Sequence, residues 1–468
     1  MKLLATLVLA AAALALAQQA PSTIPKVKFT DTRLDNGLRV IISEDHFAPL
    51  YAISVSYKVG SRDERKGRTG FAHLFEHMMF KGSENVGPGE LDFLIFTNGG
   101  NSNGTTNTDR TSYFEVLPRN QLDLGLFLEA DRMRGLVITQ ENLENQRQAV
   151  KEERRQSVDN QAYGQTSEKM EELIYDNFAY HHSVIGSMDD LDAASVDDVK
   201  QFFKTYYAPN NAVLALVGDL DTKETLAKVK KYFGNIPRQD PPKPVDLTEP
   251  PKSGERRATL EDKLARLVRL DIAYRIPPSG QPDARALSVA ASILGGGGGG
   301  FGGRGGGGGA NNSRLYQKLV LDKEVAVQVS CATDRRAGPG MFRISATLRP
   351  GKTPEEVDGL ISEEIAKLDA EPVTDKELHR VRISLRRSAE LRLTALSRAQ
   401  ALADDAAVFD DPDRINTELD HQLAITAADI QRAAKARLLA SDRVVVVTLP
   451  AAGAPGQRPS RRPGGQEN

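Results

Sequence analysis

The segment His73-Leu74-Phe75-Glu76-His77 places two histidines and a glutamate within five residues. On an α-helix, residues at positions i, i+3 and i+4 share one face, so these three side chains project to the same side. Two imidazoles one turn apart can bind one zinc ion, and a carboxylate beside them can take a proton from water. The segment therefore predicts a zinc site on a helix, and its surroundings must distinguish this from a chance occurrence.

A third ligand should come from a second helix, because a catalytic zinc ion takes three protein ligands and keeps one position for water. The segment 141–159 is strongly helical in composition, and it carries Glu144, Glu152 and Glu153. One of these carboxylates should face the metal. The residues alone leave the choice among the three open.

The fold class follows from a repeated order of elements. Segments 51–59 and 267–276 alternate with a period of two and predict strands, each followed by a polar turn and a helix. Each half also ends with a predicted strand, at 211–219 and at 442–449. This repetition predicts an α+β fold of two homologous α/β sandwich (roll) domains, each a mainly antiparallel sheet flanked by helices. The second helix, 283–294, carries no His or Glu, so we expect the chemistry in the first half only.

Composition marks the predicted boundaries within the 468 residues. A proline-rich linker, 237–256, separates an N-terminal zinc-binding catalytic domain, 24–236, from a homologous non-catalytic domain, 257–450. Lys2 and the apolar run after it, ending in Ala15-Leu16-Ala17, predict a signal peptide over 1–17 and therefore export, to the periplasm. No later stretch is apolar for long enough to span a membrane. The tail, 451–468, is rich in Pro, Gly and Arg and is expected to be disordered.

Six further stretches accompany the histidine segment: Leu34-Asp35-Asn36-Gly37-Leu38, Gly60-Ser61-Arg62-Asp63-Glu64, Met78-Met79-Phe80-Lys81-Gly82, Asn145-Gln146-Arg147-Gln148-Ala149-Val150-Lys151-Glu152-Glu153, Tyr207-Ala208-Pro209-Asn210-Asn211 and Gly218-Asp219. With it, they resemble the pitrilysin/insulinase family of inverted zinc metallopeptidases, which includes mitochondrial processing peptidase. The resemblance covers nearly the whole chain after the predicted signal peptide. It implies a zinc endopeptidase subunit that hydrolyses peptides or unfolded polypeptide segments.

The resemblance also assigns roles to single residues. It implies one Zn2+ per chain, bound by His73, His77 and Glu153, with Glu76 as the general base. Glu152 is the alternative ligand, but it would point about 100° away on the helix. Where the family often has a supporting glutamate, seven residues before the third ligand, this chain has Gln146. The amide can still form hydrogen bonds, but one negative charge beside the site is lost.

Substrate contacts and a partner are implied in the same way. The stretch around Asn103, Gly104 and Thr105 reads by itself as a turn into a strand, and the resemblance implies an edge strand that pairs with the peptide backbone. Active family members carry an Arg and a Tyr for substrate binding where this chain has Val320 and Val327, and neither valine can donate a hydrogen bond. We therefore expect a heterodimer whose homologous second subunit supplies that pair.

Other patterns narrow the function further. A net charge of −2 argues against a nucleic-acid partner held by bulk charge. The glycine-rich stretch 295–309 lacks the Gly-Lys-Ser/Thr ending of a phosphate loop and predicts a flexible loop.

The neighbouring His181 and His182 cannot easily share one ion, and Cys331 lies in an apolar, strand-like run that predicts burial. The alternative function is a non-catalytic binding or assembly subunit of a homologous complex.

Overall fold

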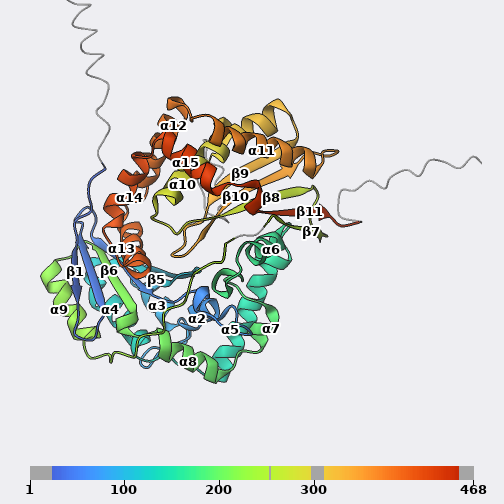
Figure 1. The fold of residues 1–468 in the computed structure, drawn as a ribbon. Helices are drawn as coiled ribbons and strands as arrows, with labels where there is room; N and C mark the ends of the chain where they lie inside the picture. The colour runs from blue at the N-terminus through green and yellow to red at the C-terminus, as the bar shows by residue number, and fades with distance from the viewer. Residues whose placement is uncertain (1–23, 252–253, 297–309, 453–468) are drawn as a thin grey trace, which may run out of the picture.

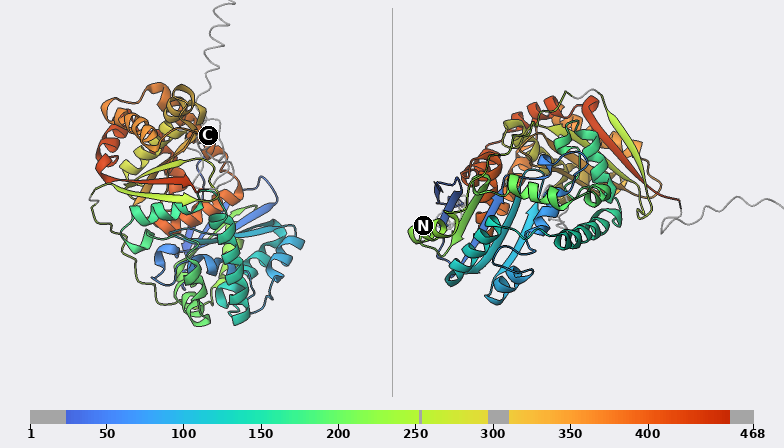
Figure 2. Two further views of the ribbon diagram at one scale, coloured as in Figure 1. Left: turned by 90° about the vertical axis from the view of Figure 1, so that its right-hand side faces the viewer. Right: turned by 90° about the horizontal axis from the view of Figure 1, so that it is seen from below.

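The computed structural model describes residues 24–251, 254–296 and 310–452, which form two lobes, each built on one β-sheet (Figures 1 and 2). The predicted α+β fold with two sheets flanked by helices is confirmed. The predicted signal peptide, 1–17, lies outside the described residues. So do 297–309 of the predicted glycine-rich loop and 453–468 of the predicted tail. No helix within the described ranges has both the length and the apolar composition needed to cross a membrane.

The first sheet has six strands in the order β1-β2-β6-β3-β5-β4, and β4 lies at its edge. All neighbouring strands are antiparallel except β2 and β6, which run parallel. Its strands are β1 (Thr30–Arg33), β2 (Arg39–Glu44), β3 (Leu50–Tyr57), β4 (Asn101–Thr106), β5 (Thr111–Pro118) and β6 (Ala212–Gly218).

The second sheet has five strands in the order β7-β11-β8-β10-β9, again with one parallel pair, β11 and β7. If β7, β11, β8, β10 and β9 are matched to β2, β6, β3, β5 and β4, the order and the directions are the same in both sheets. The predicted repeat is therefore seen as the same strand order and the same strand directions in both sheets. The strands are β7 (Arg256–Asp262), β8 (Arg269–Ile276), β9 (Ala326–Thr333), β10 (Gly340–Leu348) and β11 (Arg443–Pro450).

Helices accompany both sheets. Those of the first half are α2 (Phe71–Met78), α3 (Glu90–Thr97), α4 (Leu122–Arg134), α5 (Gln140–Arg154), α6 (Gly164–Ile174), α7 (Met188–Asp192), α8 (Val196–Tyr206) and α9 (Thr222–Phe233). Those of the second half are α10 (Pro282–Gly295), α11 (Pro354–Ala370), α12 (Asp375–Glu390), α13 (Ala395–Phe409), α14 (Arg414–Leu423) and α15 (Ala427–Arg437). The π-helical turns η3 (Arg155–Asp159) and η7 (Tyr316–Asp322) are among the shorter elements.

Each sheet packs on its second face against a helix from the other half of the chain. On β6, Leu214 and Leu216 face the core of the first half, whereas Val213, Ala215 and Val217 pack against α13. In the same way α6 of the first half packs on β8, β10 and β11 of the second sheet. Figure 1 shows both exchanged helices between the lobes. Because each half covers a sheet of the other, the two halves are joined by apolar cores and not only by the linker.

Cys331 lies on β9 and is buried, as predicted. Burial raises the pKa of its thiol well above the ordinary value, so the neutral form is favoured.

Candidate metal centre

Helix α2 begins in a backbone conformation that only glycine adopts easily. Gly70 precedes it at φ +83°, and a Cβ there would lie 2.6 Å from the carbonyl oxygen of Ile185. The buried Glu64 accepts hydrogen bonds from the backbone N–H of Gly70 at 2.9 Å and of Ala72 at 2.7 Å. A carboxylate at a helix N-terminus satisfies free N–H groups and complements the helix dipole. The start of α2, two residues before His73, is therefore held in place by Gly70 and Glu64.

His73, His77 and Glu153 converge across α2 and α5. Their nearest ligand atoms all lie within 4.8 Å of one another, and no other group of three such residues does so within the described ranges. Glu153 Oε2 lies 3.6 Å from His73 Nε2 and 3.2 Å from His77 Nε2. Ligands at about 2.0 to 2.1 Å from a tetrahedral zinc ion lie about 3.3 Å apart. The three residues thus fit a zinc ion in the spacing and in the chemistry of their donor atoms.

The two other carboxylates of the second helix point elsewhere. Glu152 accepts hydrogen bonds from Arg155 at 3.0 Å and from Gln156 at 3.2 Å. Glu144 pairs with Arg147 and accepts a hydrogen bond from Gln148. Of the three candidates left open by the sequence, only Glu153 lies beside the histidines.

Gln146 is buried on α5, and its amide donates to Asn145 Oδ1 at 2.5 Å. Among the described residues it forms no hydrogen bond to His73, His77 or Glu153.

The charges of His73 and Glu153 match metal binding. Burial lowers the pKa of His73 to about 4, so this imidazole is neutral near pH 7 and keeps a free lone pair. The hydrogen bond from His77 lowers the pKa of Glu153, which therefore stays ionised. The second ring nitrogen of His73, Nδ1, is buried and has no hydrogen-bond partner within the described chain. On its Nδ1 side, packing alone therefore orients this ring.

Glu76 lies between the two histidines and the edge strand β4. Thr106 on β4 donates a hydrogen bond from its hydroxyl to Glu76 Oε2 at 2.5 Å. A Cβ at Gly104 would lie 3.0 Å from Glu76 Cγ and 3.3 Å from Oε1, so the glycine leaves room for this side chain. Burial raises the pKa of Glu76, and the Thr106 hydroxyl opposes the rise. A carboxylate whose pKa is raised by burial is a better proton acceptor than an exposed one.

Strand β4 presents unpaired backbone groups beside Glu76. Asn107 N–H donates to the Arg110 carbonyl, and this pairing continues every second residue along the β4–β5 ladder to the pairs Thr105–Ser112 and Asn103–Phe114. The N–H and C=O groups of Ser102, Gly104 and Thr106 therefore point away from β5, although the Asn103 side chain accepts a hydrogen bond from the Gly104 N–H. Of the three residues predicted to contact a peptide, only Gly104 turns its backbone towards the open edge.

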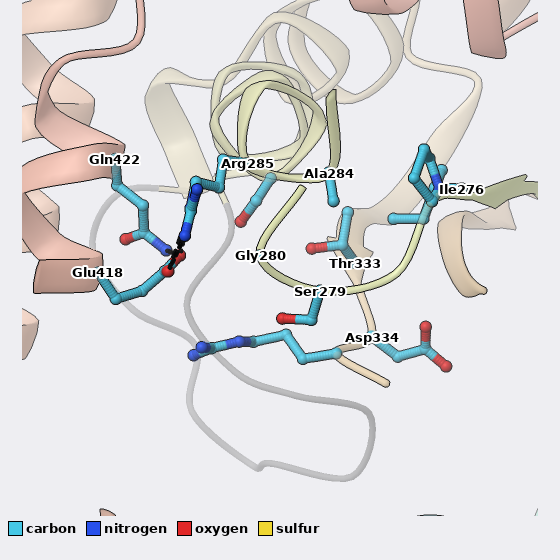
Figure 3. A pocket seen from close by; sticks show the side chains of 12 residues that line it. Ile276, Ser279, Gly280, Ala284, Arg285, Thr333, Asp334, Glu418 and Gln422 are labelled. Carbon is cyan, nitrogen blue, oxygen red and sulfur yellow. Dashed lines mark hydrogen bonds and ion pairs between the residues drawn. The ribbon is translucent and has the colours of Figure 1, made fainter. Parts of the chain in front are cut away.

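The second half offers no comparable site at the predicted positions. Val320 on η7 is 7% exposed and belongs to the second core, whereas Val327 on the edge strand β9 is 45% exposed. The cavity in Figure 3 has a volume of about 20 Å³ and is crossed by the ion pair between Arg285 and Glu418 at 2.9 Å. This space is enough for about one water molecule. It is too small for a peptide.

His181 and His182 make separate contacts. His181 Nδ1 lies 2.7 Å from the Tyr175 carbonyl oxygen, and His182 Nδ1 lies 3.6 Å from Glu64 Oε2. His182 therefore borders the carboxylate that holds the start of α2. The pair does not form a second cluster of ligands.

Two sequence profiles match the chain one after the other. Residues 39–187 match "Insulinase (Peptidase family M16)", and residues 193–385 match "Peptidase M16 inactive domain". The chain belongs to the insulinase family of peptidases. The first profile contains both histidines, Glu76 and Glu153, and the described part of the second contains none of the cluster.

Relatives of this family extend over most of the chain. The zinc protease PqqE of Helicobacter pylori is 29% identical over 419 residues, which cover 89% of this chain and 91% of that protein. The mitochondrial-processing peptidase subunit beta of Bos taurus is 25% identical over 279 residues, or 60% of this chain and 56% of that one. A crystal structure of a protease from Helicobacter pylori has a TM-score of 0.83 at 28% identity and covers 91% of this chain and all of its own.

The structure adds residues that the sequence did not point out. Thr106 contacts Glu76 and follows the predicted stretch by one residue, and a period-two reading of β4 would have placed it on the same face as Gly104. Glu64 lies within one of the quoted motifs, but its contact with the start of α2 has no local sequence signal. Asp109 and Arg110 lie in the turn after β4, where charged residues usually mean only a solvated turn.

Proposed function

We propose that this chain is a zinc-dependent endopeptidase subunit in which His73, His77 and Glu153 bind the metal. The convergence of three ligand atoms from two helices, with Glu153 close to the spacing of a tetrahedral ion from each histidine, is the observation that carries this proposal. Bound by these residues, a zinc ion would make water acidic enough to lose a proton near neutral pH and would polarise a peptide carbonyl.

Glu76 acts as the general base. Its carboxylate takes the proton from the attacking water and returns it to the leaving amine, which requires a base that is ionised at the working pH. Thr106 keeps the carboxylate in place and favours its ionised form. The role of Glu76 also distinguishes an enzyme from a structural metal site, because a structural site needs no base and closes its fourth position.

The substrate lies extended against β4. The carbonyl groups of Ser102, Gly104 and Thr106 and the N–H groups of Ser102 and Thr106 face the open edge beside Glu76, and an added strand would pair with them. Such pairing selects an extended, unfolded backbone more than particular side chains. Peptides and unfolded segments are therefore the proposed substrate class, with Asn103, Gly104 and Thr105 next to the bound chain.

A glutamine in place of Glu76 tests the proposal. The variant Glu76→Gln should retain about one zinc ion per chain and lose cleavage of a quenched-fluorescence peptide by a factor of at least about 10². The control is Glu152→Gln, since Glu152 pairs with Arg155 and not with the histidines. Zinc binding without peptide cleavage by the wild-type chain, alone or with a partner, would support the binding or assembly subunit instead.

A homologous partner subunit is part of the same proposal. Val320 and Val327 cannot donate hydrogen bonds to a developing oxyanion. The bovine relative is itself named a subunit. We propose a heterodimer with a related chain that supplies an Arg and a Tyr. Equal cleavage by the purified chain alone and by the chain mixed with such a partner would refute this part.

Export to the periplasm completes the proposal. Its support is the apolar run after Lys2 that ends in Ala15-Leu16-Ala17. Cell fractionation and N-terminal sequencing of the mature protein would test it. A protein found in the cytoplasm with residues 1–17 still attached would contradict it.

A further inference from the structure

The hairpin formed by β4 and β5 connects the candidate site to the second half of the chain. At one end of this connection Thr106 contacts Glu76. Immediately beyond β4, the turn residues Asp109 and Arg110 contact elements that begin more than 200 residues later. The hairpin therefore links Glu76 to the half that carries none of the cluster, through a hydrogen bond on one side and through polar contacts of its turn on the other.

Arg110 bridges two elements. Its Nη1 donates hydrogen bonds to the Thr105 carbonyl oxygen at 2.8 Å and to the Thr105 hydroxyl at 2.7 Å. Its Nε lies 3.0 Å from Asp404 Oδ2 on α13, and the other Asp404 oxygen accepts a hydrogen bond from Ser56 of β3. Because the Arg110 side chain is only 13% exposed, these contacts are largely shielded from water.

Asp109 fixes the same turn from the other side. One carboxylate oxygen accepts hydrogen bonds from Arg62 at 2.8 Å and from the Tyr180 hydroxyl at 2.7 Å. The other oxygen accepts the backbone N–H of Ala337, in the turn between β9 and β10, at 2.9 Å. The turn after β4 thus has one contact with α13 and one with the hairpin formed by β9 and β10, here called the second hairpin.

The second hairpin repeats this arrangement. Arg336, in the turn between β9 and β10, lies 2.8 Å from Glu171 on α6, the helix that the first half contributes to the second sheet. In both halves an arginine of the hairpin turn therefore pairs with a carboxylate of the exchanged helix. Only in the first half does the hairpin lead to the histidine cluster.

We propose that Arg110 is a positioning residue: through Asp404 on α13 it uses the second half of the chain to hold β4 in line with Glu76. The Arg110 guanidinium donates a hydrogen bond to the Thr105 carbonyl oxygen and so fixes its position. The next residue, Thr106, donates a hydrogen bond to Glu76, the proposed base. The second half therefore acts on the reaction without touching it. This inference rests on the proposed function for its kinetic consequence, but its structural consequence can be measured without any cleavage.

The test compares three site variants with one matched control in the full chain. Arg110→Ala removes the contacts to Thr105 and Asp404. Arg110→Lys keeps the positive charge but lacks the planar guanidinium that contacts both residues, and Asp404→Asn removes the negative charge on α13. The control, Arg398→Ala, removes another arginine–aspartate pair between α13 and the first half, because Arg398 pairs with Asp45 in the turn before β3. Zinc content, thermal unfolding, kinetic constants on a quenched peptide and amide hydrogen exchange of 101–106 are measured for each.

Arg110→Ala should increase exchange at the amides of Asn103 and Thr105 by about tenfold and lower kcat/KM by roughly 10- to 100-fold, with zinc content unchanged. For Arg110→Lys and Asp404→Asn, both the amide exchange rates and kcat/KM should lie between those of Arg110→Ala and those of the wild type. Arg398→Ala should lower thermal stability yet leave kcat/KM within about twofold.

Two results would overturn the proposal: equal kinetic losses in Arg110→Ala and Arg398→Ala, or unchanged exchange of the β4 amides in all three site variants. If Arg110→Ala does not fold, the two milder variants decide. A wild-type chain that cleaves no peptide would remove the proposed function alone, and the exchange data would still support or refute the positioning role.

Discussion

Thr106→Val is the most direct perturbation of the candidate base. It replaces the hydroxyl that donates to Glu76 Oε2 at 2.5 Å by a methyl group of similar shape. Hydrogen bonds to charged groups contribute about 1.5 to 3 kcal/mol, so the ionised form of Glu76 should lose about this much stabilisation. Each 1.36 kcal/mol corresponds to a factor of ten, so we expect cleavage on the acid limb of the pH profile, where the base is mostly protonated, to fall by roughly 10- to 100-fold.

The pH profile should change in a defined direction. Burial raises the pKa of Glu76 and the Thr106 hydroxyl lowers it, so removal of the hydroxyl should raise it further. Because the base must be ionised, the acid limb of the kcat/KM profile should move to higher pH in Thr106→Val, and activity should recover in part at alkaline pH. Zinc content should not change, since Thr106 is not among the three ligands.

The assay is cleavage of a quenched-fluorescence peptide between pH 5 and pH 9, with zinc measured in each preparation. Thr106→Ser keeps a hydroxyl and should restore most of the activity. Thr97→Val is the matched control, because the Thr97 hydroxyl bonds only to carbonyl groups of its own helix α3. An unshifted acid limb together with unchanged kcat/KM in Thr106→Val would refute the reasoning that links β4 to the base.

Three further predictions follow from the ligands, the ion pairs and the exchanged helices. Glu153→Gln should weaken zinc binding at least about tenfold in a chelator competition while Glu152→Gln does not, and equal retention in both would contradict the ligand assignment. Burial opposes ionisation of Glu377, but hydrogen bonds from Arg314 and Thr374 hold its pKa at about 2. The ionised Glu377 therefore stabilises the fold fully above about pH 4.5, and this stabilisation is lost as the pH falls towards 2. Urea unfolding of Glu377→Gln should accordingly show a deficit of about 1 to 2 kcal/mol at pH 7 that shrinks by pH 3, and a deficit independent of pH would argue against this ion pair. Leu402→Ala on α13 should cost about 2 to 5 kcal/mol and keep one unfolding transition, whereas two separate transitions would show that the halves fold independently.

Local sequence patterns predicted the elements and the candidate ligands because both depend on spacing along one segment. The helix spacing of His73 and His77 and the alternation of β3 and β8 carry their own periodicity. The resemblance to a family then selected Glu153 from three neighbouring carboxylates, and the structure places it beside the histidines.

Contacts between distant segments could not be predicted in this way. The apolar faces of α6 and α13 are visible in the sequence, but periodicity does not say which sheet a helix covers, so their exchange between the halves was missed. Arg110 and Asp404 are separated by 294 positions, and neither has a local pattern that points to the other. Gln146 is a different case, because its expected place beside the ligands came from a family position alone, and in the structure its amide donates to Asn145.

The exchange of α6 and α13 also determines when, during synthesis, the first sheet can be covered on both faces. Strand β6, the last strand of the first sheet, ends at Gly218, and the helix that covers its second face begins at Ala395, 177 residues later. At a synthesis rate of about 5 to 20 residues per second, a ribosome needs roughly 10 to 35 s to make that stretch. During this interval Val213, Ala215 and Val217 have no covering helix, so the half with the histidines reaches its final form only when the chain is almost complete. A nascent chain that stays unfinished for so long remains open to a chaperone, to a translocation channel or to a protease.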